Sequence, residues 1–301
     1  MELGMIGLGR MGANMTERLL RGNHRLVVHD VDSAATRRAS GQGAVPAASI
    51  EAVVQELKPP RAVWVMVPAG DPVEQTVNRL IGLLQKNDVI IDGGNSNYKD
   101  SMRRSSACAS KGIDFIDVGT SGGIWGLREG YCLMIGGPEA AVSRLRPIFE
   151  TLAPAADRGW AHVGQAGSGH FVKMVHNGIE YGLMQAYAEG FALLQKKSGF
   201  HFDIHEIAEV WRHGSVVRSW LLDLTAEALA EDATLEHIRP EVGDSGEGRW
   251  AVAEAIEQNV SAPVITMSLL ERIRSRDRES FADKLLAVMR NKFGGHPVKT
   301  Q

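Results

Sequence analysis

The feature that most constrains the fold of this chain is a glycine-rich turn that lies between a short apolar segment and an amphipathic one. Residues 3–6 are apolar, Gly7-Leu8-Gly9-Arg10-Met11-Gly12 follows, and a helical pattern then runs to Gly22. Glycines let the backbone turn sharply and approach a phosphate, whose charge is stabilised by free N–H groups and by the positive end of the helix dipole. The pattern therefore predicts a strand–turn–helix unit that binds a dinucleotide.

A second strand pattern at residues 25–29 ends at Asp30, about 20 residues after the glycine turn, where dinucleotide-binding units carry an acidic residue. A carboxylate there accepts hydrogen bonds from ribose hydroxyls and repels a 2′-phosphate. We therefore expect NAD as the cofactor and weaker binding of NADP, because Arg37 and Arg38 offer some compensation for a 2′-phosphate. The alternative is that Asp30 only begins the turn at residues 30–33.

Apolar runs typical of strands recur along the first half and are mostly separated by helical patterns, at residues 62–67, 89–92, 113–117, 131–135 and 160–163. Their continuous apolar character predicts a doubly wound, Rossmann-type parallel sheet with helices on both faces. Ligands of such sheets bind beyond the carboxyl ends of the strands. Three polar or glycine-rich loops follow these runs and are expected to meet the nicotinamide: Val67-Pro68-Ala69-Gly70, Asp92-Gly93-Gly94-Asn95-Ser96 and Gly119-Thr120-Ser121-Gly122-Gly123.

The second half is wholly helical in pattern. Helices are predicted at residues 170–197, 203–213, 216–230, 249–258 and 262–290. We expect an α/β dinucleotide-binding domain at residues 1–164, an all-α substrate and dimerisation domain at 165–289, and a tail at 290–301 that reaches a neighbouring subunit.

The first of these helices carries an unusual polar stripe. At about 100° per residue, Lys173, Asn177, Glu180 and Tyr181 share one face, with His176 at its edge. Apolar residues cover most of the remaining surface of the helix, which predicts burial on most sides. A solvated amphipathic helix is the alternative, although His, Asn and Tyr are more typical of a defined polar pocket. Lys173 and Glu180 lie about 10 Å apart along the axis, so a small substrate fits between them.

Composition excludes several classes of protein. A net charge of -3 argues against a nucleic-acid or anionic-membrane surface. The chain has only two cysteines, without metal-ligand spacing or a disulfide framework, which favours a reducing, cytoplasmic setting and no metal. No apolar run approaches the roughly 18 residues of a membrane span. A small anionic molecule remains compatible with these limits.

Five motifs occur in a fixed order: the glycine turn, Asp92–Ser96, Ser121–Gly123, Gly169–Tyr181 and Arg290–His296. In this order they resemble the 6-phosphogluconate dehydrogenase family of the β-hydroxyacid dehydrogenase group, over nearly the whole chain and in its short form. The resemblance implies oxidative decarboxylation of 6-phosphogluconate to ribulose 5-phosphate and CO2, with hydride transfer to NAD. It also implies a homodimer or homotetramer.

The resemblance further implies a role for each site residue. Lys173 is the general base and Glu180 the general acid. The sugar-acid carboxylate and hydroxyls are held by Asn95, Ser121, Gly122, Gly123, His176 and Asn177. The 6-phosphate is held by Tyr181, Arg249, Arg272 and, from a neighbouring subunit, Arg290 and His296. A lysine base must be neutral, although its unperturbed pKa is about 10.4; partial burial and the positive nicotinamide are expected to lower that pKa.

Two positions depart from the family pattern. Arg249 stands where longer members usually carry lysine, and His29-Asp30-Val31-Asp32 replaces the Asn-Arg-Thr of NADP-dependent members. Two rival functions remain open: a β-hydroxyacid dehydrogenase that does not decarboxylate, whose helix usually reads Asn-Asn after the lysine, and a non-catalytic NAD-binding sensor.

Overall fold

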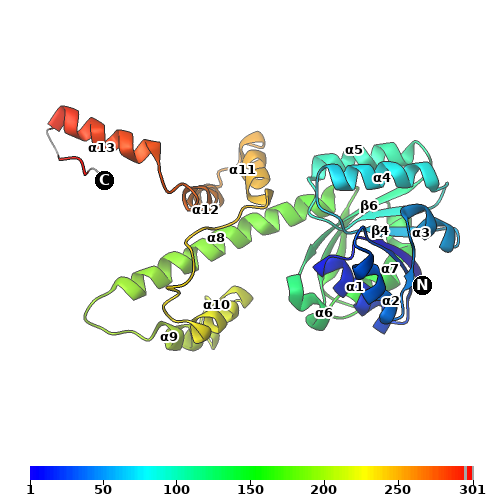
Figure 1. Ribbon diagram of the computed structural model, residues 1–301, viewed down its shortest axis with the longest axis horizontal. Coiled ribbons are helices and arrows are strands. Elements are labelled where there is room, and N and C mark those ends of the chain that lie inside the picture. The colour runs from blue at the N-terminus through cyan, green and yellow to red at the C-terminus, as the bar shows by residue number, and fades with distance from the viewer. Residues whose placement is uncertain (295–296, 300–301) are drawn as a thin grey trace. The chain divides into compact units, whose positions relative to one another are not determined.

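The computed structural model describes residues 1–294 and 297–299. The chain forms two compact units, Met1–His176 (unit 1) and Asn177–Gln301 (unit 2). One long helix, α8 (Ser168–Lys196), contributes its first turns to unit 1 and the rest to unit 2 (Figure 1). The predicted domain limits at residues 164 and 289 stay predictions.

Unit 1 is built on an eight-stranded sheet with the order β3-β2-β1-β4-β5-β6-β7-β8. The strands are β1 (Glu2–Ile6), β2 (Arg25–His29), β3 (Val45–Pro46), β4 (Ala62–Val65), β5 (Val89–Asp92), β6 (Asp114–Ser121), β7 (Cys132–Gly136) and β8 (Trp160–Gly164). The chain runs outward from β1 to one edge and then from β4 to the other, which confirms the predicted doubly wound fold. The order of the strands reverses between β1 and β4, and ligands of such sheets bind at this point.

Helices cover both faces of this sheet. They are α1 (Arg10–Arg21), α2 (Ser33–Gly41), α3 (Ile50–Glu56), α4 (Asp71–Leu83), α5 (Tyr98–Ala109), α6 (Gly126–Glu129) and α7 (Glu139–Leu152). One buried cluster joins the sheet to α1, α2 and α7, and a second joins the opposite face to α3, α4 and α5 (Figure 1). Alternate strand residues enter the two clusters: Leu3 and Met5 pack on one face and Ile6 on the other.

The expectation of a purely parallel sheet was wrong at two strands, β7 and β8. β7 pairs antiparallel with β6, and β8 pairs parallel with β7, so both run opposite to the first six strands. Residues 122–131 connect β6 to β7 and contain only a 3₁₀ turn and the four-residue α6. A parallel crossover needs about a dozen residues or more, so this connection reverses the strand instead.

The antiparallel partner also lengthens β6 beyond its predicted end. Gly119 pairs with Met134 and Ser121 with Cys132, so residues 119–121 belong to the strand and not to a loop. Only Gly122 and Gly123 lie in the turn, both with positive φ (124° and 50°). The short strand β3 carries too few residues to give a periodic pattern and was not predicted.

Unit 2 is helical, as predicted. Besides α8 it contains α9 (Ile204–Arg212), α10 (Trp220–Glu231), α11 (Glu247–Glu257), α12 (Pro263–Arg274) and α13 (Phe281–Gly294). Its described core is a small cluster of five buried residues from α8, α9 and α10: Phe191, Ala208, Leu222, Ala226 and Leu229.

Two predicted helices of this unit were wrong in extent. The predicted helix 262–290 is two helices, because residues 274–280 offer no apolar side chain to pack and Ser280 accepts a hydrogen bond from the N–H of Asp283 (3.2 Å) as a new N-cap. The predicted helix 216–230 begins at Trp220, because Ser219 caps it through the N–H of Leu222 (3.2 Å).

Candidate active site

The glycine turn of unit 1 has the shape that a phosphate requires. A Cβ on Gly7, whose φ is +95°, would lie 2.4 Å from the carbonyl oxygen of Met66, and one on Gly12 would lie 2.0 Å from that of Gly7. Gly9 is the N-cap of α1; it has open space around its Cα and offers no side-chain acceptor. The first turn of α1 also carries no acidic residue. This N-terminus therefore fits a dinucleotide pyrophosphate.

Asp30 contacts the glycine turn directly. Its carboxylate accepts hydrogen bonds from the N–H of Leu8 (2.6 Å) and from that of Asp32 (2.7 Å). The side chain thus joins the end of β2 to the turn after β1. This is the turn-forming role that the sequence left open for Asp30, and its bond to a ribose stays a prediction. Arg10 is exposed at the start of α1, whereas Met11 packs against the core.

The next two loops lie at the same edge of the sheet. Val67-Pro68-Ala69 follows β4, and the loop that carries the exposed Asn95 follows β5. Asp92 organises the second loop: its carboxylate accepts hydrogen bonds from the hydroxyl of Ser96 (2.7 Å) and the N–H of Gly94 (3.2 Å).

A buried ion-pair chain supports this loop and was missed by the sequence argument. Arg104, only 2% exposed, donates to Asp92 (3.3 Å) and to Glu74 (2.9 Å). Hydrogen bonds from Arg103 and Arg104 hold the pKa of Glu74 at about 2, well below its usual range. The signal in the sequence was a carboxylate inside an otherwise apolar strand, because such a group is buried only with partners.

The first turns of α8 lie directly on β6. A Cβ on Gly119 would lie 2.4 Å from the Cβ of Lys173, so only glycine lets the helix approach this closely. Lys173 is 7% exposed. One turn later, Nε2 of His176 lies 3.3 Å from the hydroxyl of Ser121. The structure therefore brings together three predicted site residues of unit 1, namely Lys173, His176 and Ser121.

In unit 2, a second group of predicted residues surrounds Tyr181. The guanidinium of Arg272 lies 3.6 Å from the centre of the Tyr181 ring, within the range of a cation–π contact. The Tyr181 hydroxyl is 3.3 Å from that of Ser245, and Arg272 also donates to the carbonyl of Gly243 (2.9 Å). A Cβ on Gly248 would lie 2.7 Å from the Tyr181 ring, so glycine is needed here too.

The other predicted site residues do not form one cluster with these two groups. Arg249 donates to Asp244 (2.5 Å) and is half exposed. Asn177 is buried and Glu180 half-buried on α8, while Arg290 is exposed on α13. His296 lies outside the described residues.

The expected burial of α8 on most sides was wrong. Val172, Val175 and Ile179 are 36%, 37% and 54% exposed, and they form an apolar stripe at i, i+3 and i+7. Periodicity identified the apolar face correctly, but nothing in this single chain covers it among the described residues.

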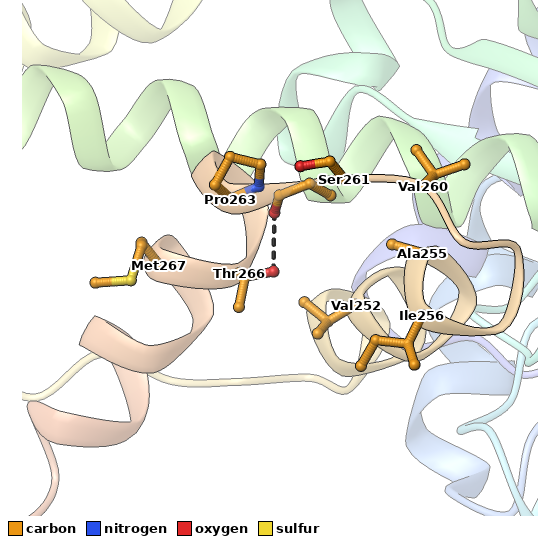
Figure 2. A pocket seen from close by; sticks show the side chains of 9 residues that line it. Val252, Ala255, Ile256, Val260, Ser261, Pro263, Thr266 and Met267 are labelled. Atoms are coloured by element: carbon orange, nitrogen blue, oxygen red, sulfur yellow. Dashed lines mark hydrogen bonds between the residues drawn. The ribbon is translucent and has the colours of Figure 1, made fainter.

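A cavity of about 360 Å³ lies elsewhere in unit 2. Figure 2 shows its mainly apolar lining from α11, α12 and their connection: Val252, Ala255, Ile256, Val260, Ser261, Ala262, Pro263, Thr266 and Met267. The hydroxyl of Thr266 is satisfied by the carbonyl of Ala262 (2.8 Å). None of the predicted site residues lines it, so this cavity is not the candidate active site.

Two further structural facts concern residues 1–294 and 297–299. No three His, Cys, Asp or Glu side chains in these ranges gather at metal-binding spacing. None of their helices combines the length and apolar character that a membrane crossing requires.

Comparison with known proteins adds to this geometry. Residues 2–164 match the model of the NAD binding domain of 6-phosphogluconate dehydrogenase, and residues 169–298 match the model of its C-terminal domain. A 6-phosphogluconate dehydrogenase of Haloferax volcanii, named as NAD(+)-dependent and decarboxylating, is 44% identical over 99% of this chain and 98% of its own.

Two longer proteins are also similar. A decarboxylating 6-phosphogluconate dehydrogenase of Synechococcus elongatus is 36% identical over 98% of this chain and 66% of its own length. The solved structure of Plasmodium falciparum 6-phosphogluconate dehydrogenase, described with NADP+ as its cofactor, superposes with a TM-score of 0.84 at 28% identity. The match covers 100% of this chain and 66% of that one.

Proposed function

This chain belongs to the 6-phosphogluconate dehydrogenase family, and we propose that it converts 6-phosphogluconate to ribulose 5-phosphate and CO2 with reduction of NAD. The observation that carries the proposal is that Lys173 is buried and packs directly against Gly119 of β6. A buried lysine in a unit that also carries a dinucleotide-binding turn suits proton transfer at a carbon that is being oxidised.

The N-terminus of α1 would hold the cofactor pyrophosphate, and the loops after β4 and β5 would meet its nicotinamide end. When bound, NAD supplies the acceptor for a hydride from C3 of the sugar acid. Gly9 supports this assignment, because the space around it is open while Gly7 and Gly12 are tightly packed.

Lys173 accepts the proton of the C3 hydroxyl while the hydride leaves the same carbon. Burial favours the neutral amine that this step requires. The protonated lysine then donates a hydrogen bond to the new ketone oxygen, which stabilises the charge that develops as the carboxylate leaves as CO2. Ser121 and His176, 3.3 Å apart, would hold the substrate carboxylate with Asn95, Asn177 and the turn at Gly122 and Gly123.

Glu180 lies seven residues after Lys173 on α8, about 10 Å further along the axis. In this position it donates a proton to C1 of the enediol that decarboxylation leaves, and ribulose 5-phosphate results. Lys173 thus acts at C3 of the substrate, and Glu180 acts at the neighbouring carbon, which becomes C1 of the product.

The phosphate of the substrate would be bound by Arg272 and Tyr181, with Arg249 beside them. The Arg272 guanidinium is held over the Tyr181 ring, 3.6 Å from its centre, which pre-organises its remaining N–H groups for phosphate oxygens. Arg290 and His296 of a second copy complete this set in the proposal.

The proposed preference for NAD depends on Asp30. Its carboxylate is bound to the glycine turn and would face the adenosine ribose, where it repels a 2′-phosphate. The Haloferax relative bears NAD(+) in its name, whereas the Plasmodium structure is described with NADP+, so family membership alone does not decide the cofactor.

We also propose a cytoplasmic homodimer or homotetramer. Both cysteines are free thiols, which suits a reducing compartment. Helix α13 exposes an apolar stripe at i, i+4, i+7 and i+8, formed by Phe281, Leu285, Val288 and Met289. A second copy of this chain would cover that stripe and bring Arg290 to its neighbour.

One assay tests the proposed function. Purified protein is mixed with 6-phosphogluconate and either NAD or NADP, and reduced cofactor and CO2 are followed together. We expect equal amounts of both products and a kcat/KM at least about tenfold higher with NAD, equivalent to about 1.4 kcal/mol. Reduced cofactor without CO2 would identify a dehydrogenase that does not decarboxylate. Binding of NAD without turnover would identify a sensor.

A further inference from the structure

Asp117 is a fully buried carboxylate for which the proposed reaction has no use. It lies on β6 with 0% exposure, two residues before Gly119. One carboxylate oxygen accepts a hydrogen bond from the N–H of Gly167 (2.6 Å), and the other accepts one from the N–H of His170 (2.8 Å). Both donors belong to the start of α8. A helix is ordinarily capped by the residue before it, whereas this one is capped by a strand some 50 residues earlier.

The same turn of α8 is pressed against backbone atoms of the sheet. A Cβ on Gly169 would lie 2.5 Å from the carbonyl oxygens of Asp117 and Met134, and one on Gly136 would lie 2.6 Å from the Asp117 carboxylate. The helix therefore cannot move closer to the sheet. The two charge-assisted hydrogen bonds, aided by the positive end of the helix dipole, keep it from moving away.

A second contact fixes the sideways position of the helix. Nδ1 of His170, which is 2% exposed, is hydrogen-bonded to the hydroxyl of Ser101 on α5 at 2.7 Å. The Asp117 carboxylate approaches the same nitrogen, at 4.0 Å. A catalytic Ser–His–Asp relay needs the acid and the hydroxyl on different ring nitrogens. The cluster is therefore an anchor and not a nucleophile.

This anchor lies one helical turn from the lysine. Asp117 and Gly119 share one face of β6, because side chains alternate along a strand. On the helix, Lys173 follows Gly169 by four residues, so the turn bound by the carboxylate lies directly before the turn that carries the amine. Any tilt or shift of the first turn displaces the lysine by a similar distance.

We propose that Asp117 is a positioning residue for Lys173, which holds the start of α8 at a fixed height and angle over β6. The inference rests on the proposed function of Lys173 as the base. A displacement of about 1 Å at a catalytic group costs roughly 100-fold in rate. Binding of the cofactor, which uses the α1 end of the sheet, does not depend on this anchor.

Asp117→Asn tests the proposal with almost no change in volume. An amide presents one oxygen and one NH2 group, so one of the two backbone N–H groups faces a donor instead of an acceptor. We expect kcat with 6-phosphogluconate to fall about 100-fold, while the KM for NAD changes by less than about threefold. Hydrogen exchange of the amides at 167 and 170, measured without substrate, should accelerate.

Asp88→Asn is the matched control. Asp88 is equally buried, on the residue before β5, and accepts hydrogen bonds from the N–H groups of Arg61 (2.6 Å) and Gln85 (3.0 Å) at the other end of the strands. It should lose stability but keep its kcat and the exchange rates of α8. Ser101→Ala, which removes the contact to His170 and a longer hydrogen bond to the carbonyl of Asn97 (3.3 Å) within the first turn of α5, should fold and lower kcat by a smaller factor at an unchanged KM for NAD.

The outcomes separate this proposal from the proposed function. Failure of the wild-type protein to turn over 6-phosphogluconate removes the proposed function, and the hydrogen exchange of Asp117→Asn still reports whether the anchor exists.

A kcat within about threefold of wild type in Asp117→Asn, or unchanged exchange at the start of α8, overturns the positioning role. If Asp117→Asn does not fold, a normal kcat in Ser101→Ala overturns it. An equal loss of kcat in Asp88→Asn would also overturn it, because the effect would then be general destabilisation.

Discussion

The two units of this chain bury their apolar residues in different ways. In unit 1 the sheet carries a buried cluster on each face, and both clusters are closed by helices of the same unit. In unit 2 the described core is a cluster of five residues, while α8, α12 and α13 leave large apolar side chains exposed. Ile179 is 54% exposed and Phe281 76%. Unit 1 therefore buries its apolar surface within itself, whereas the described part of unit 2 leaves apolar side chains exposed, which we propose a second copy of this chain covers.

This difference divides the proposed chemistry. The cofactor turn and the lysine belong to unit 1, where buried carboxylates hold the loops and the start of α8. The proposed phosphate ligands belong to unit 2 and to its neighbour. Cofactor binding should therefore depend on unit 1 alone, and substrate binding should depend on assembly.

The largest effect is expected for Lys173→Met, which removes the amine at similar volume. Turnover should fall about 10³-fold or more, because general-base catalysis contributes roughly 10²–10⁴ and the hydrogen bond to the ketone oxygen is lost as well. The Kd for NAD, measured by titration calorimetry, should stay near that of wild type. Turnover close to wild type would remove Lys173 as the base; a large rise in the Kd for NAD would show that Lys173 also takes part in cofactor binding.

Leu285→Glu on α13 tests the incompleteness of unit 2. A charge in the centre of the apolar stripe should prevent its burial against a second copy. We expect a monomer in sedimentation velocity, a rise of about 30-fold in the KM for 6-phosphogluconate, and an unchanged Kd for NAD.

The control is Asp283→Asn on the opposite side of α13, which also changes one charge. It should leave the assembly intact. If Leu285→Glu keeps both the oligomer and its KM, the exposed stripe is not an interface. Burial against a second copy then does not explain why unit 2 exposes apolar side chains that unit 1 buries.

Arg272→Lys tests the phosphate group of unit 2 more locally. Lysine keeps the charge but loses the planar fork that lies on Tyr181 and the hydrogen bond to Gly243. The KM for 6-phosphogluconate should rise about tenfold, equivalent to about 1.4 kcal/mol, with a much smaller change in kcat. Arg274→Lys on the same helix is the control, because Arg274 is exposed and pairs only weakly with Glu271 (3.8 Å). Equal effects of the two variants would contradict a specific role for Arg272.

The parts of this molecule that local pattern determines could be predicted from sequence. The glycine turn and the order of strand and helix depend on neighbouring residues, and the polar stripe of α8 depends on helical periodicity. Pairing of Ser121 within β6 was missed, because it depends on a short connection that reverses the next strand. The bond between Asp117 and the start of α8 was missed, because it joins residues 50 positions apart. A buried aspartate in each of two largely apolar strands, Asp92 in β5 and Asp117 in β6, was the available signal, since a buried carboxylate requires partners.

The smallest effect concerns the two cysteines, which report on unit 1 without altering it. Burial raises the pKa of the Cys108 thiol to about 12, so at pH 8 only about one molecule in 10⁴ carries the reactive thiolate. Cys132 is exposed on β7. A thiol reagent should therefore modify Cys132 rapidly in the native protein and Cys108 only when unit 1 opens.

Labelling along a urea series then compares the two units directly. Because unit 2 has the smaller closed core, we expect helical circular dichroism to fall first in the Leu285→Glu monomer, while Cys108 remains unmodified until a higher urea concentration. Cys108→Ser controls for reaction at Cys132. Coincident loss of both signals would mean that the units unfold as one cooperative body, and that unit 1 gains its stability from unit 2 instead of from its own two clusters.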